Sequence, residues 1–597
     1  MTFEIGLMLT LIVLALVFFV RETFPIEVTA LALLATLLVT GLVSPADAFA
    51  GFSNKAVLAI AALFVLSHAL VRTGVLETLA EELGRRVGSR SWLGIGLLLG
   101  LVAVLSGFLN NTAVVAIFIP LTLDLSARFG VSPSKVLIPL SYASIFGGTL
   151  TLIGTSTNLL VSSLLEDAGE PPIRMFELTP LGFVLLAIGL VYILLFARRG
   201  LPGRAEPGAL TGKYRMSSYL TEVRVDADSP LVGRTCRETR LAERYGVSVL
   251  AIVGPRERPV DDVANEKLRP DDVLIVQARM DDTVRLAREE GLSRLPEVKL
   301  SGDAELEAGG FDLAEVLVAP LSGLIGKTIK DVNFRERYGC FVIAIRRVGV
   351  TLRDKIARVR LRFPDCLLVL VPRGGLEELR QREDLMVVST PPSHLWRGRF
   401  WWLVLVLLPV AVLLAALGVM EIAATATVAV VLLLLAGALA PPESYRSINW
   451  SVIFLIAAFV PVGSAFLTTG TADFLASGLL WVARAVPPEA APWASLALVY
   501  LGTSLLTQMV SNAAAAIIVT PIAISLAGNL GLDPRPFVVA ICFAASAEFM
   551  TPMGYQTNLM VYGPGAYRFL DYTRFGGPLN LLFWVLAVAL IPRFWPF

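Results

Sequence analysis

The sequence predicts an α-helical polytopic membrane protein with two inverted repeats, each of five spans plus a re-entrant hairpin, and a cytosolic α/β insert of two tandem domains between them. Three observations predict this fold class. First, 55% of the 597 residues are hydrophobic and only 17% are charged, and the mean hydropathy is +0.72. Second, apolar runs long enough to cross a hydrocarbon core of about 30 Å occupy both ends of the chain and are absent from roughly 205–393. Third, the two ends repeat each other.

The first half, residues 1–200, contains five apolar runs of spanning length and a pair of arms at 91–128 that meet at a polar tip. The runs lie near 3–20, 26–43, 55–72, 135–160 and 177–197. Residues 3–20 have no basic segment before them and no small-residue cleavage site after them. We therefore expect them to be a retained span and not a signal peptide.

The second half, residues 396–597, repeats this order with polar-tipped arms at 493–528. Its spans lie near 400–419, 421–440, 450–468, 535–561 and 578–595. The repeat extends to the letters, because "IAALFVLSHALVRTGVLETLA" (60–80) aligns without a gap with "IAAFVPVGSAFLTTGTADFLA" (456–476). Five crossings are an odd number, so the halves lie upside down relative to each other if the arms are hairpins that do not cross.

The distribution of basic residues predicts the orientation in a cell membrane, inner or plasma. Short cytoplasmic loops carry an excess of Lys and Arg, and most basic loop residues of both halves fall on the side of the insert, as Arg198, Arg199 and Arg446 do. We therefore expect a cytoplasmic insert and both termini outside. The two hairpins then enter from opposite faces and meet near the midplane.

The hairpin tips are polar. "FLNNTAVVAIFIP" (108–120) places Asn110, Asn111 and Thr112 in an apolar run, and the second hairpin has Ser511 and Asn512 at the same place. Such residues can simply join helices. However, there are two related clusters, and each is followed by an interrupted helix carrying "IGTSTN" (153–158) or "MGYQTN" (553–558). Because irregular backbone at membrane depth must be buried or line a cavity, the pair of clusters indicates a site.

The residue types at the tips indicate what this site would bind. Amide, hydroxyl and carbonyl oxygens suit hard cations such as Na⁺. The free N–H groups and positive dipole ends of half-helices suit an anion. An anion and cations bound side by side lower each other's free-energy cost of leaving water for a buried site. We therefore expect them to bind together and to be transported together.

These residues resemble those of the divalent anion/sodium symporters, a family that includes sodium–sulfate and sodium–dicarboxylate carriers. One hallmark is Ser-Asn-Thr at each tip, represented here by Asn110-Asn111-Thr112 and Ser511-Asn512-Ala513. The other is a Gly-Thr stretch ending in Asn, represented by the two interrupted-helix motifs. The resemblance covers essentially all of both membrane halves.

The resemblance implies roles for individual residues. One sodium site would use Ser106, Asn110, Asn111 and backbone near Gly154, and the other Thr507, Ser511, Asn512 and backbone near Gly554. The substrate would contact Asn111, Thr112, Thr155, Asn512, Ala513 and Tyr555. Further candidates are Asn158, Glu548, Thr551 and Asn558. The resemblance also implies Na⁺ as co-transported ion, no organic cofactor, a homodimer, and an elevator-type movement of the site across the bilayer.

Departures from the family pattern bear on the substrate. Asn110 replaces the usual serine, Ala513 lacks a hydroxyl, and "GTSTN" lacks the prolines common in dicarboxylate carriers. These departures favour sulfate over a dicarboxylate, which remains the alternative. Glu548 is an intramembrane carboxylate and so a candidate functional residue. It could bind a cation or a proton, or cap a half-helix.

The insert contains a repeat of its own. "SPLVGRTCRETRLAERYGVSVLAI" (229–252) matches "SGLIGKTIKDVNFRERYGCFVIAI" (322–345), and both copies resemble the TrkA-C (RCK-C) ligand-binding subdomain of proteins that regulate potassium transport. We expect one such domain in 205–300 and another in 301–393. No GxGxxG follows a strand in the insert, so a dinucleotide-binding half is not expected. The domains could bind a small-molecule regulator or have a structural role.

Composition and motifs argue against other functions. A net charge of +1 produces no strong positive electrostatic field that would attract nucleic acid. The four cysteines form no CxxC pair, and no nucleophile–base or metal-ligand constellation indicates an enzyme. A potassium channel would need a TVGYG-type filter, which the chain lacks. A cation/proton antiporter of related architecture is a further alternative function.

Overall fold

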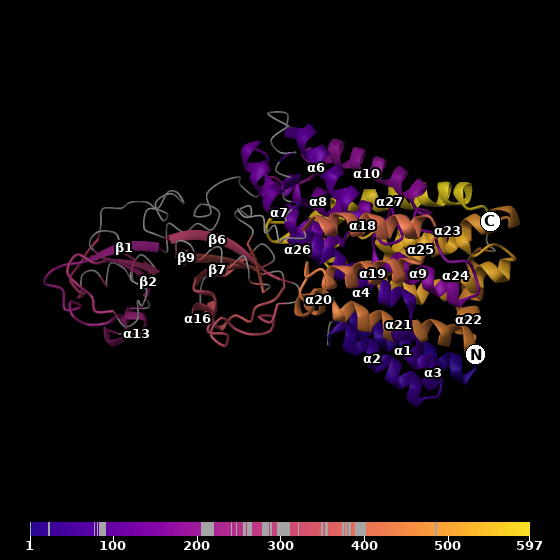
Figure 1. Cartoon of the computed structure of the whole chain (residues 1–597), viewed down its shortest axis with the longest axis horizontal. Helices are drawn as coiled ribbons and strands as arrows, with labels where there is room; N and C mark the ends of the chain where they lie inside the picture. Colours follow the sequence, from indigo (N-terminus) through magenta and orange to yellow (C-terminus); the bar gives the residue numbers. More distant parts are fainter. Residues whose placement is uncertain are drawn as a thin grey trace.

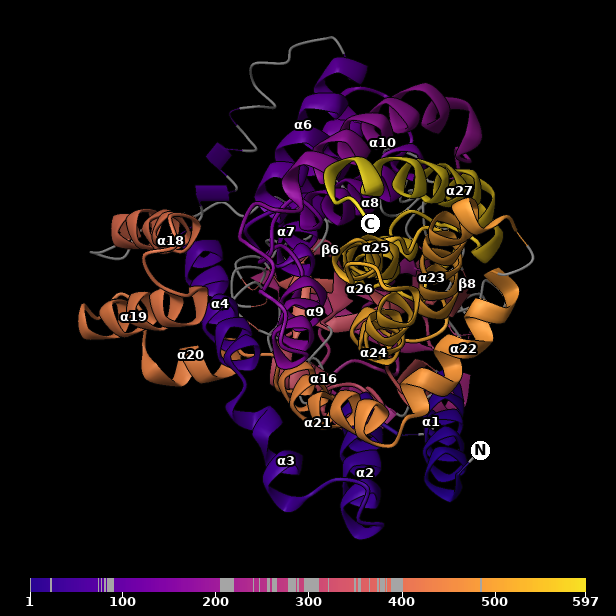
Figure 2. The same cartoon turned by 90° about the vertical axis from the view of Figure 1, so that its right-hand side faces the viewer.

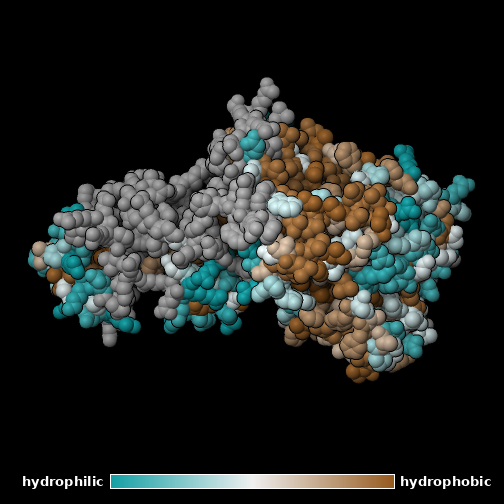
Figure 3. Space-filling model, in the orientation of Figure 1, coloured by the Kyte–Doolittle hydropathy of each residue, from teal (hydrophilic) through white to brown (hydrophobic). Residues whose placement is uncertain are grey.

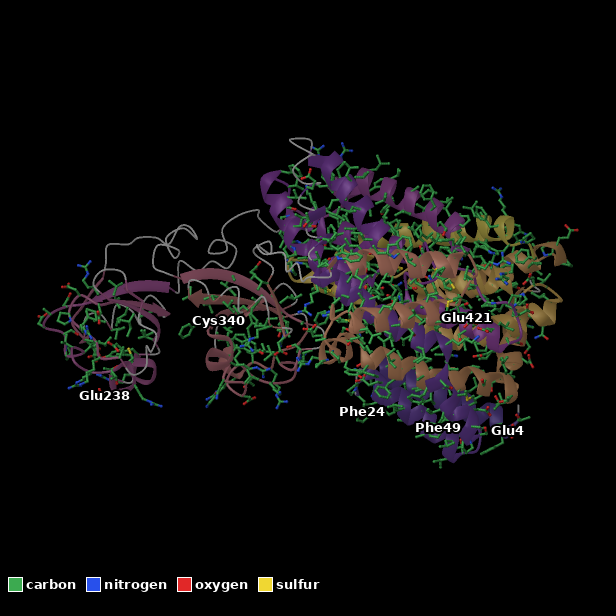
Figure 4. All side chains as sticks on the ribbon, viewed as in Figure 1. Glu4, Phe24, Phe49, Glu238, Cys340 and Glu421 are labelled. Carbon is green, nitrogen blue, oxygen red and sulfur yellow. The ribbon has the colours of Figure 1, made fainter. Side chains whose placement is uncertain are left out.

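The computed structural model of the chain shows a body of helices from which two β-sheet modules project at one end (Figure 1). The structure describes 2–204 apart from 22–23 and most of 74–90, much of 220–294 and 311–387, and 401–597 apart from 484–485. Figure 3 shows a broad hydrophobic surface over the middle of the body and hydrophilic residues at its far end and on the modules. Exposed aromatic side chains at the periphery include Phe49 in the helix Pro45–Ala50 and Phe24 in the connection between the helices Phe3–Arg21 and Ile26–Val39 (Figure 4).

Six helices in the described part of the chain are long and apolar enough to cross a membrane, judged by length and composition. They are Pro45–Arg72, Thr179–Gly200, Trp450–Thr468, Pro488–Thr507, Asn512–Leu530 and Phe569–Phe594. The first of these consists of two α-helices joined by a short 3-10 segment. Shorter apolar helices lie in the predicted runs 3–20, 26–43, 400–419, 421–440 and 535–561, and the helix Leu137–Gly148 lies in the run 135–160. The predicted mostly helical, multi-pass membrane protein is confirmed.

The first half contains α1 Phe3–Arg21, α2 Ile26–Val39, α3 Pro45–Ala50, α4 Lys55–Arg72, α6 Ser91–Ser106, α7 Asn111–Arg128, α8 Leu137–Gly148, α9 Ser156–Asp167 and α10 Thr179–Gly200. The second half contains α18 Trp401–Ala416, α19 Ile422–Leu435, α20 Pro441–Ser447, α21 Trp450–Thr468, α22 Thr471–Ala483, α23 Ala491–Thr507, α24 Asn512–Leu530, α25 Arg535–Ser546, α26 Gln556–Tyr562 and α27 Phe569–Phe594. Figure 2 shows α9, α24, α25 and α26 near the centre of the body and α2, α3, α18, α19 and α20 at its periphery.

Several helix boundaries differ from the predicted spans, and three of them have a clear local cause. Helices α2 and α19 end before 43 and 440, because Gly41 and Gly437 adopt positive φ angles of 75° and 68° and terminate them. Helix α27 begins before 578, because the Asp571 carboxylate accepts the Arg568 backbone N–H at 2.7 Å and starts the helix there.

The contacts between helices follow a two-fold pattern. Helix α2 packs on α21, and its counterpart α19 packs on α4. Likewise α7 packs on α26, and α24 packs on α9. The bounds of α2 and α19 both differ by 396 (422 − 26 and 435 − 39). Each half therefore uses equivalent elements to contact the other, as the sequence repeat predicts; their inversion across the bilayer stays a prediction.

Aromatic residues near the centre join the two halves. The Tyr142 hydroxyl donates to the Phe549 carbonyl at 2.5 Å, and the two rings lie 5.0 Å apart between centroids. Phe583 packs against Phe549 at 5.3 Å. Helix α27 approaches the backbone of Phe549 so closely that a Cβ atom at Gly576 would overlap the Phe549 carbonyl oxygen. This position therefore requires glycine.

Within its described residues, the insert forms two antiparallel sheets of five strands each. The strands are β1 Leu220–Val225, β2 Ser248–Gly254, β3 Arg258–Pro259, β4 Val273–Gln277 and β5 Leu292–Arg294, then β6 Phe311–Val318, β7 Phe341–Arg347, β8 Val350–Leu352, β9 Cys366–Pro372 and β10 Leu385–Val387. The orders β3-β2-β4-β1-β5 and β8-β7-β9-β6-β10 are the same. Both modules also carry a register shift at the same place, Val249/Ala251 and Val342/Ala344. The predicted duplication of the insert is thus present in its fold.

Each module contains the same side-chain cluster. In the first, the Tyr245 hydroxyl donates to the Glu290 carboxylate at 2.7 Å, and burial together with this bond raises the pKa of Tyr245 to about 12. In the second, the Tyr338 hydroxyl donates to the Asp384 carboxylate at 2.6 Å. The second module also contacts the helical body, because fully buried Leu317 belongs to the apolar core of that body.

Candidate functional site

Two helical hairpins present their tips to the interior of the body. Helices α6 and α7 meet at residues 107–110, and α23 and α24 meet at 508–511. The Asn110 side-chain oxygen accepts the Thr112 backbone N–H at 2.8 Å, and the Ser511 hydroxyl accepts the Ala514 N–H at 3.4 Å. These tip residues therefore cap α7 and α24, which is the local reason that each second arm begins where it does.

The two interrupted helices have the same internal bonding. Residues 149–155 separate α8 from α9, and 547–555 separate α25 from α26. Asn158 donates its amide to the Gly148 and Thr151 carbonyls at 3.4 and 3.0 Å. Asn558 donates to the Glu548 and Thr551 carbonyls at 2.7 and 3.3 Å. Both asparagines thus hold a non-helical turn in place.

The tips and the turns enclose one cavity of about 180 Å³ reachable by water-sized molecules. Predicted site residues that line it are Asn110, Asn111, Thr112, Gly154, Thr155, Ser511, Asn512, Ala513, Gly554 and Tyr555. Six predicted residues do not line it, and all of them except Thr551 are buried: Ser106, Asn158, Thr507, Glu548, Thr551 and Asn558. The described lining residues include no charged side chain.

Four helix N-termini meet at this cavity. Helices α7, α24, α9 and α26 begin at Asn111, Asn512, Ser156 and Gln556, and all four residues line it. Helix N-termini carry partial positive charge and free N–H donors. The cavity is therefore suited to an anion without a basic side chain.

We call Ser106 and Asn111, two residues of the first predicted sodium site, the first cluster; both are buried. The Asn111 amide nitrogen donates to the Tyr555 hydroxyl at 2.7 Å, which fixes the direction of its oxygen. That oxygen, and the Ser106 hydroxyl oxygen, have no hydrogen-bond partner within the described part of the chain. Unpartnered buried oxygens are uncommon, and they are the ligands that Na⁺ prefers.

A second cluster surrounds Thr507 at the equivalent place in the second half. The Thr507 hydroxyl oxygen lies 2.9 Å from the Ala545 carbonyl oxygen, 2.9 Å from Glu548 Oε1 and 3.4 Å from the Asn512 side-chain oxygen. One hydroxyl has a single proton and can donate to only one of these oxygens at a time. The cluster therefore gathers more acceptors than donors, which again fits a cation.

Sequence reasoning missed several polar residues at the site, and three of them form hydrogen bonds at the hairpin tips. Gln556 lines the cavity, and its side-chain oxygen accepts the Thr112 hydroxyl at 3.1 Å. Gln508 ties the second tip to the turn beside it by donating to the Ala547 carbonyl at 2.9 Å. Ser67 accepts the Asn110 N–H at 3.2 Å. Only Gln556 carried a signal, since it lies inside the "MGYQTN" motif.

Comparisons with known proteins identify a transporter family. The family model CitMHS, described as citrate transporter, matches residues 16–532 and 491–595. An uncharacterized transporter of Synechocystis sp. is 38% identical over 99% of this chain and 97% of its own length. The uncharacterized transporter YfbS of Escherichia coli is 30% identical over 100% of both chains. Sodium/sulfate cotransporter 2 of Chlamydomonas reinhardtii is 24% identical over 92% of this chain and 84% of its own length.

Proposed function

This chain belongs to the citrate transporter family CitMHS, a family of transporters and not of enzymes, and we propose that it is a sodium-coupled symporter of a divalent anion, with sulfate favoured. One observation carries the proposal. A cavity at which four helix N-termini meet lies between two clusters of buried oxygens, one from each half.

The magnitudes explain why cations would accompany the anion. A helix N-terminus stabilises an anion by roughly 0.3–1 kcal/mol, and by about 2 kcal/mol in buried geometry. Four such termini supply several kcal/mol, whereas removing each charge of an ion from water costs several kcal/mol by itself. For a dianion held only by helix dipoles, the stabilisation by the dipoles is thus at best about equal to the cost of removing its charges from water. Two Na⁺ ions in the oxygen clusters supply the missing attraction, so the anion binds well only together with Na⁺.

Two observations support sulfate. Relatives similar along most of this chain are named sodium/sulfate cotransporters, and Ala513 leaves the second tip without the hydroxyl that would face a larger carboxylate. The family description, citrate transporter, instead favours a carboxylate, so a sodium-coupled carboxylate symporter is the second candidate. A cation/proton antiporter is the third: it would use the oxygen clusters alone and leave the four N-termini without an anion.

The wider mechanism is proposed on the same basis. The protein would be a homodimer in the cell membrane and would carry the site across the bilayer by an elevator movement, with the insert in the cytoplasm and both termini outside. The peripheral helices α18 and α19 expose large apolar side chains, among them Val406, Leu413 and Leu435, which lipid or a second copy would cover. The TrkA-C-like modules would bind a small-molecule regulator.

Uptake by the purified protein in proteoliposomes tests the proposal. We expect radiolabelled sulfate to accumulate under an inward Na⁺ gradient and not when choline replaces Na⁺ at equal ionic strength. Competition by unlabelled sulfate, succinate and citrate then ranks the substrates, and carboxylates as the better competitors would select the second candidate. Absence of Na⁺-dependent uptake of all three, with Na⁺ flux driven by a pH gradient, would replace the proposal with an antiporter.

A further inference from the structure

The two oxygen clusters are not equivalent, and the difference lies at one position. The turns of the interrupted helices correspond residue by residue, because Asn158 bonds the carbonyls of Gly148 and Thr151 and Asn558 bonds those of Glu548 and Thr551. Glu548 therefore occupies the place that Gly148 occupies in the first half. One half has a carboxylate where the other has no side chain.

The first cluster has no room for such a side chain. A Cβ atom at Gly148 would lie 2.8 Å from both the Asn111 amide nitrogen and a Thr155 methyl carbon. Its oxygens, those of Ser106 and Asn111, are all uncharged. A cation there is held by neutral dipoles, and the anion has to supply the compensating charge.

In the second cluster the carboxylate points at the other oxygens. Glu548 is fully buried, its Oε1 accepts the Thr507 hydroxyl at 2.9 Å, and its Oε2 has no hydrogen-bond partner in the described part of the chain. The ion pairs of the described residues do not include it. The Thr507 hydroxyl and the neighbouring Asn512 side chain leave part of the four lone-pair sites of this buried carboxylate open, and a bound cation is the group that fits them.

Resting on the proposed sodium coupling, we propose that Glu548 is a direct ligand of the cation in the second cluster, so that this cation binds before the anion and without it. The remaining ligands are the Thr507 hydroxyl, the Ala545 carbonyl and the Asn512 side-chain oxygen. Both charges of the substrate then remain for the first cluster and the helix N-termini. The order of binding is fixed: first the cation at Glu548, then the anion together with the cation at Ser106 and Asn111.

Thermal stability of the purified full-length protein, measured against NaCl concentration with choline chloride as the balance and no sulfate, tests this order. We expect Na⁺ to stabilise the wild-type protein, and Glu548→Gln to weaken the apparent Na⁺ affinity at least tenfold. One variant is the matched control: Glu166→Gln removes a carboxylate that faces solvent beside Lys55 and should keep the sulfate-free Na⁺ affinity.

The outcomes separate this inference from the proposed function. If Na⁺ stabilises Glu548→Gln as it does the wild type, or if the wild-type protein responds to Na⁺ only when sulfate is present, Glu548 is not the ligand and the order is refuted, while sodium–sulfate coupling stands. If neither Na⁺ nor sulfate stabilises the wild type under any combination, the proposed function itself fails. Should Glu548→Gln not fold, binding of radiolabelled Na⁺ to the wild type decides: one ion per chain without sulfate supports the order, and none refutes it.

Discussion

The hydrogen bond between Asn111 and Tyr555 permits a sharp test of the first oxygen cluster. The two residues come from different halves of the chain, and the Asn111 amide donates to the Tyr555 hydroxyl at 2.7 Å. Tyr555→Phe removes that acceptor and leaves the amide free to rotate while keeping the Asn111 oxygen. Asn111→Ala removes the oxygen as well. The pair therefore separates the orientation of a ligand from the ligand itself.

The expected sizes follow from the structure. A net hydrogen bond contributes about 1 kcal/mol, and an unsatisfied buried partner costs about 1–3 kcal/mol. Since 1.4 kcal/mol is a factor of ten in an equilibrium constant, Tyr555→Phe should raise the Na⁺ concentration for half-maximal sulfate uptake by about 5-fold or more. Asn111→Ala should abolish coupled uptake while the protein stays folded. The double variant should behave as Asn111→Ala alone, because both changes remove the same bond.

The assay is Na⁺-dependent sulfate uptake in proteoliposomes, with protein content and monodispersity matched between variants. Uptake by Asn111→Ala with the wild-type Na⁺ dependence would remove the first tip from the mechanism. A Tyr555→Phe variant that changes the half-saturation for sulfate but not for Na⁺ would refute the orienting role and place the tyrosine at the anion instead.

Three further predictions concern the fold and the insert. Gly576→Ala should lower the melting temperature, because its Cβ would overlap the Phe549 carbonyl and overpacking costs about 1–3 kcal/mol; an unchanged melting curve would contradict the close approach. Burial favours protonated Asp384, but the Tyr338 hydrogen bond, a backbone N–H and an adjacent guanidinium outweigh it and lower its pKa. This group therefore stabilises the fold above its unfolded-state pKa of about 3.9 and loses that contribution as pH falls through its lower folded value, so Asp384→Asn should flatten the acid limb of a stability–pH curve. Replacing 205–393 by a linker should leave some uptake, and complete loss despite normal insertion would make the insert part of the transport cycle.

Much of the architecture could be predicted from the sequence because the two membrane halves repeat the same order of elements. The repeat located both hairpins and both interrupted helices, and the polar tips then stood out against apolar surroundings. The ends of helices were harder to predict. The capping by Asp571 and the positive φ of Gly41 depend on backbone geometry, which a hydropathy pattern does not report. Such local interactions shift the end of a helix by several residues without changing the order of helices along the chain.

The composition of the oxygen clusters could be predicted only in part. Family motifs pointed to the tip residues, which the structure gathers around one cavity. The neighbours of Thr507 could not be read from the sequence, since Glu548 is 41 residues away along the chain. The same holds for Thr112 and Gln556, which are 444 residues apart. Contacts between distant segments are fixed by packing, and no local pattern reports them.

The way the two halves share the cavity has an evolutionary consequence. Each hairpin tip bonds or packs against an interrupted helix of the other half, as Asn111 does with Tyr555 and α24 with α9. One half alone therefore provides a tip without the turn that faces it. An ancestral protein of half this length would have enclosed such a cavity only by pairing with a second copy of itself in the opposite orientation. Fusion of the two copies would then have freed each to diverge, which is how a glycine at 148 and a glutamate at 548 can stand in corresponding places.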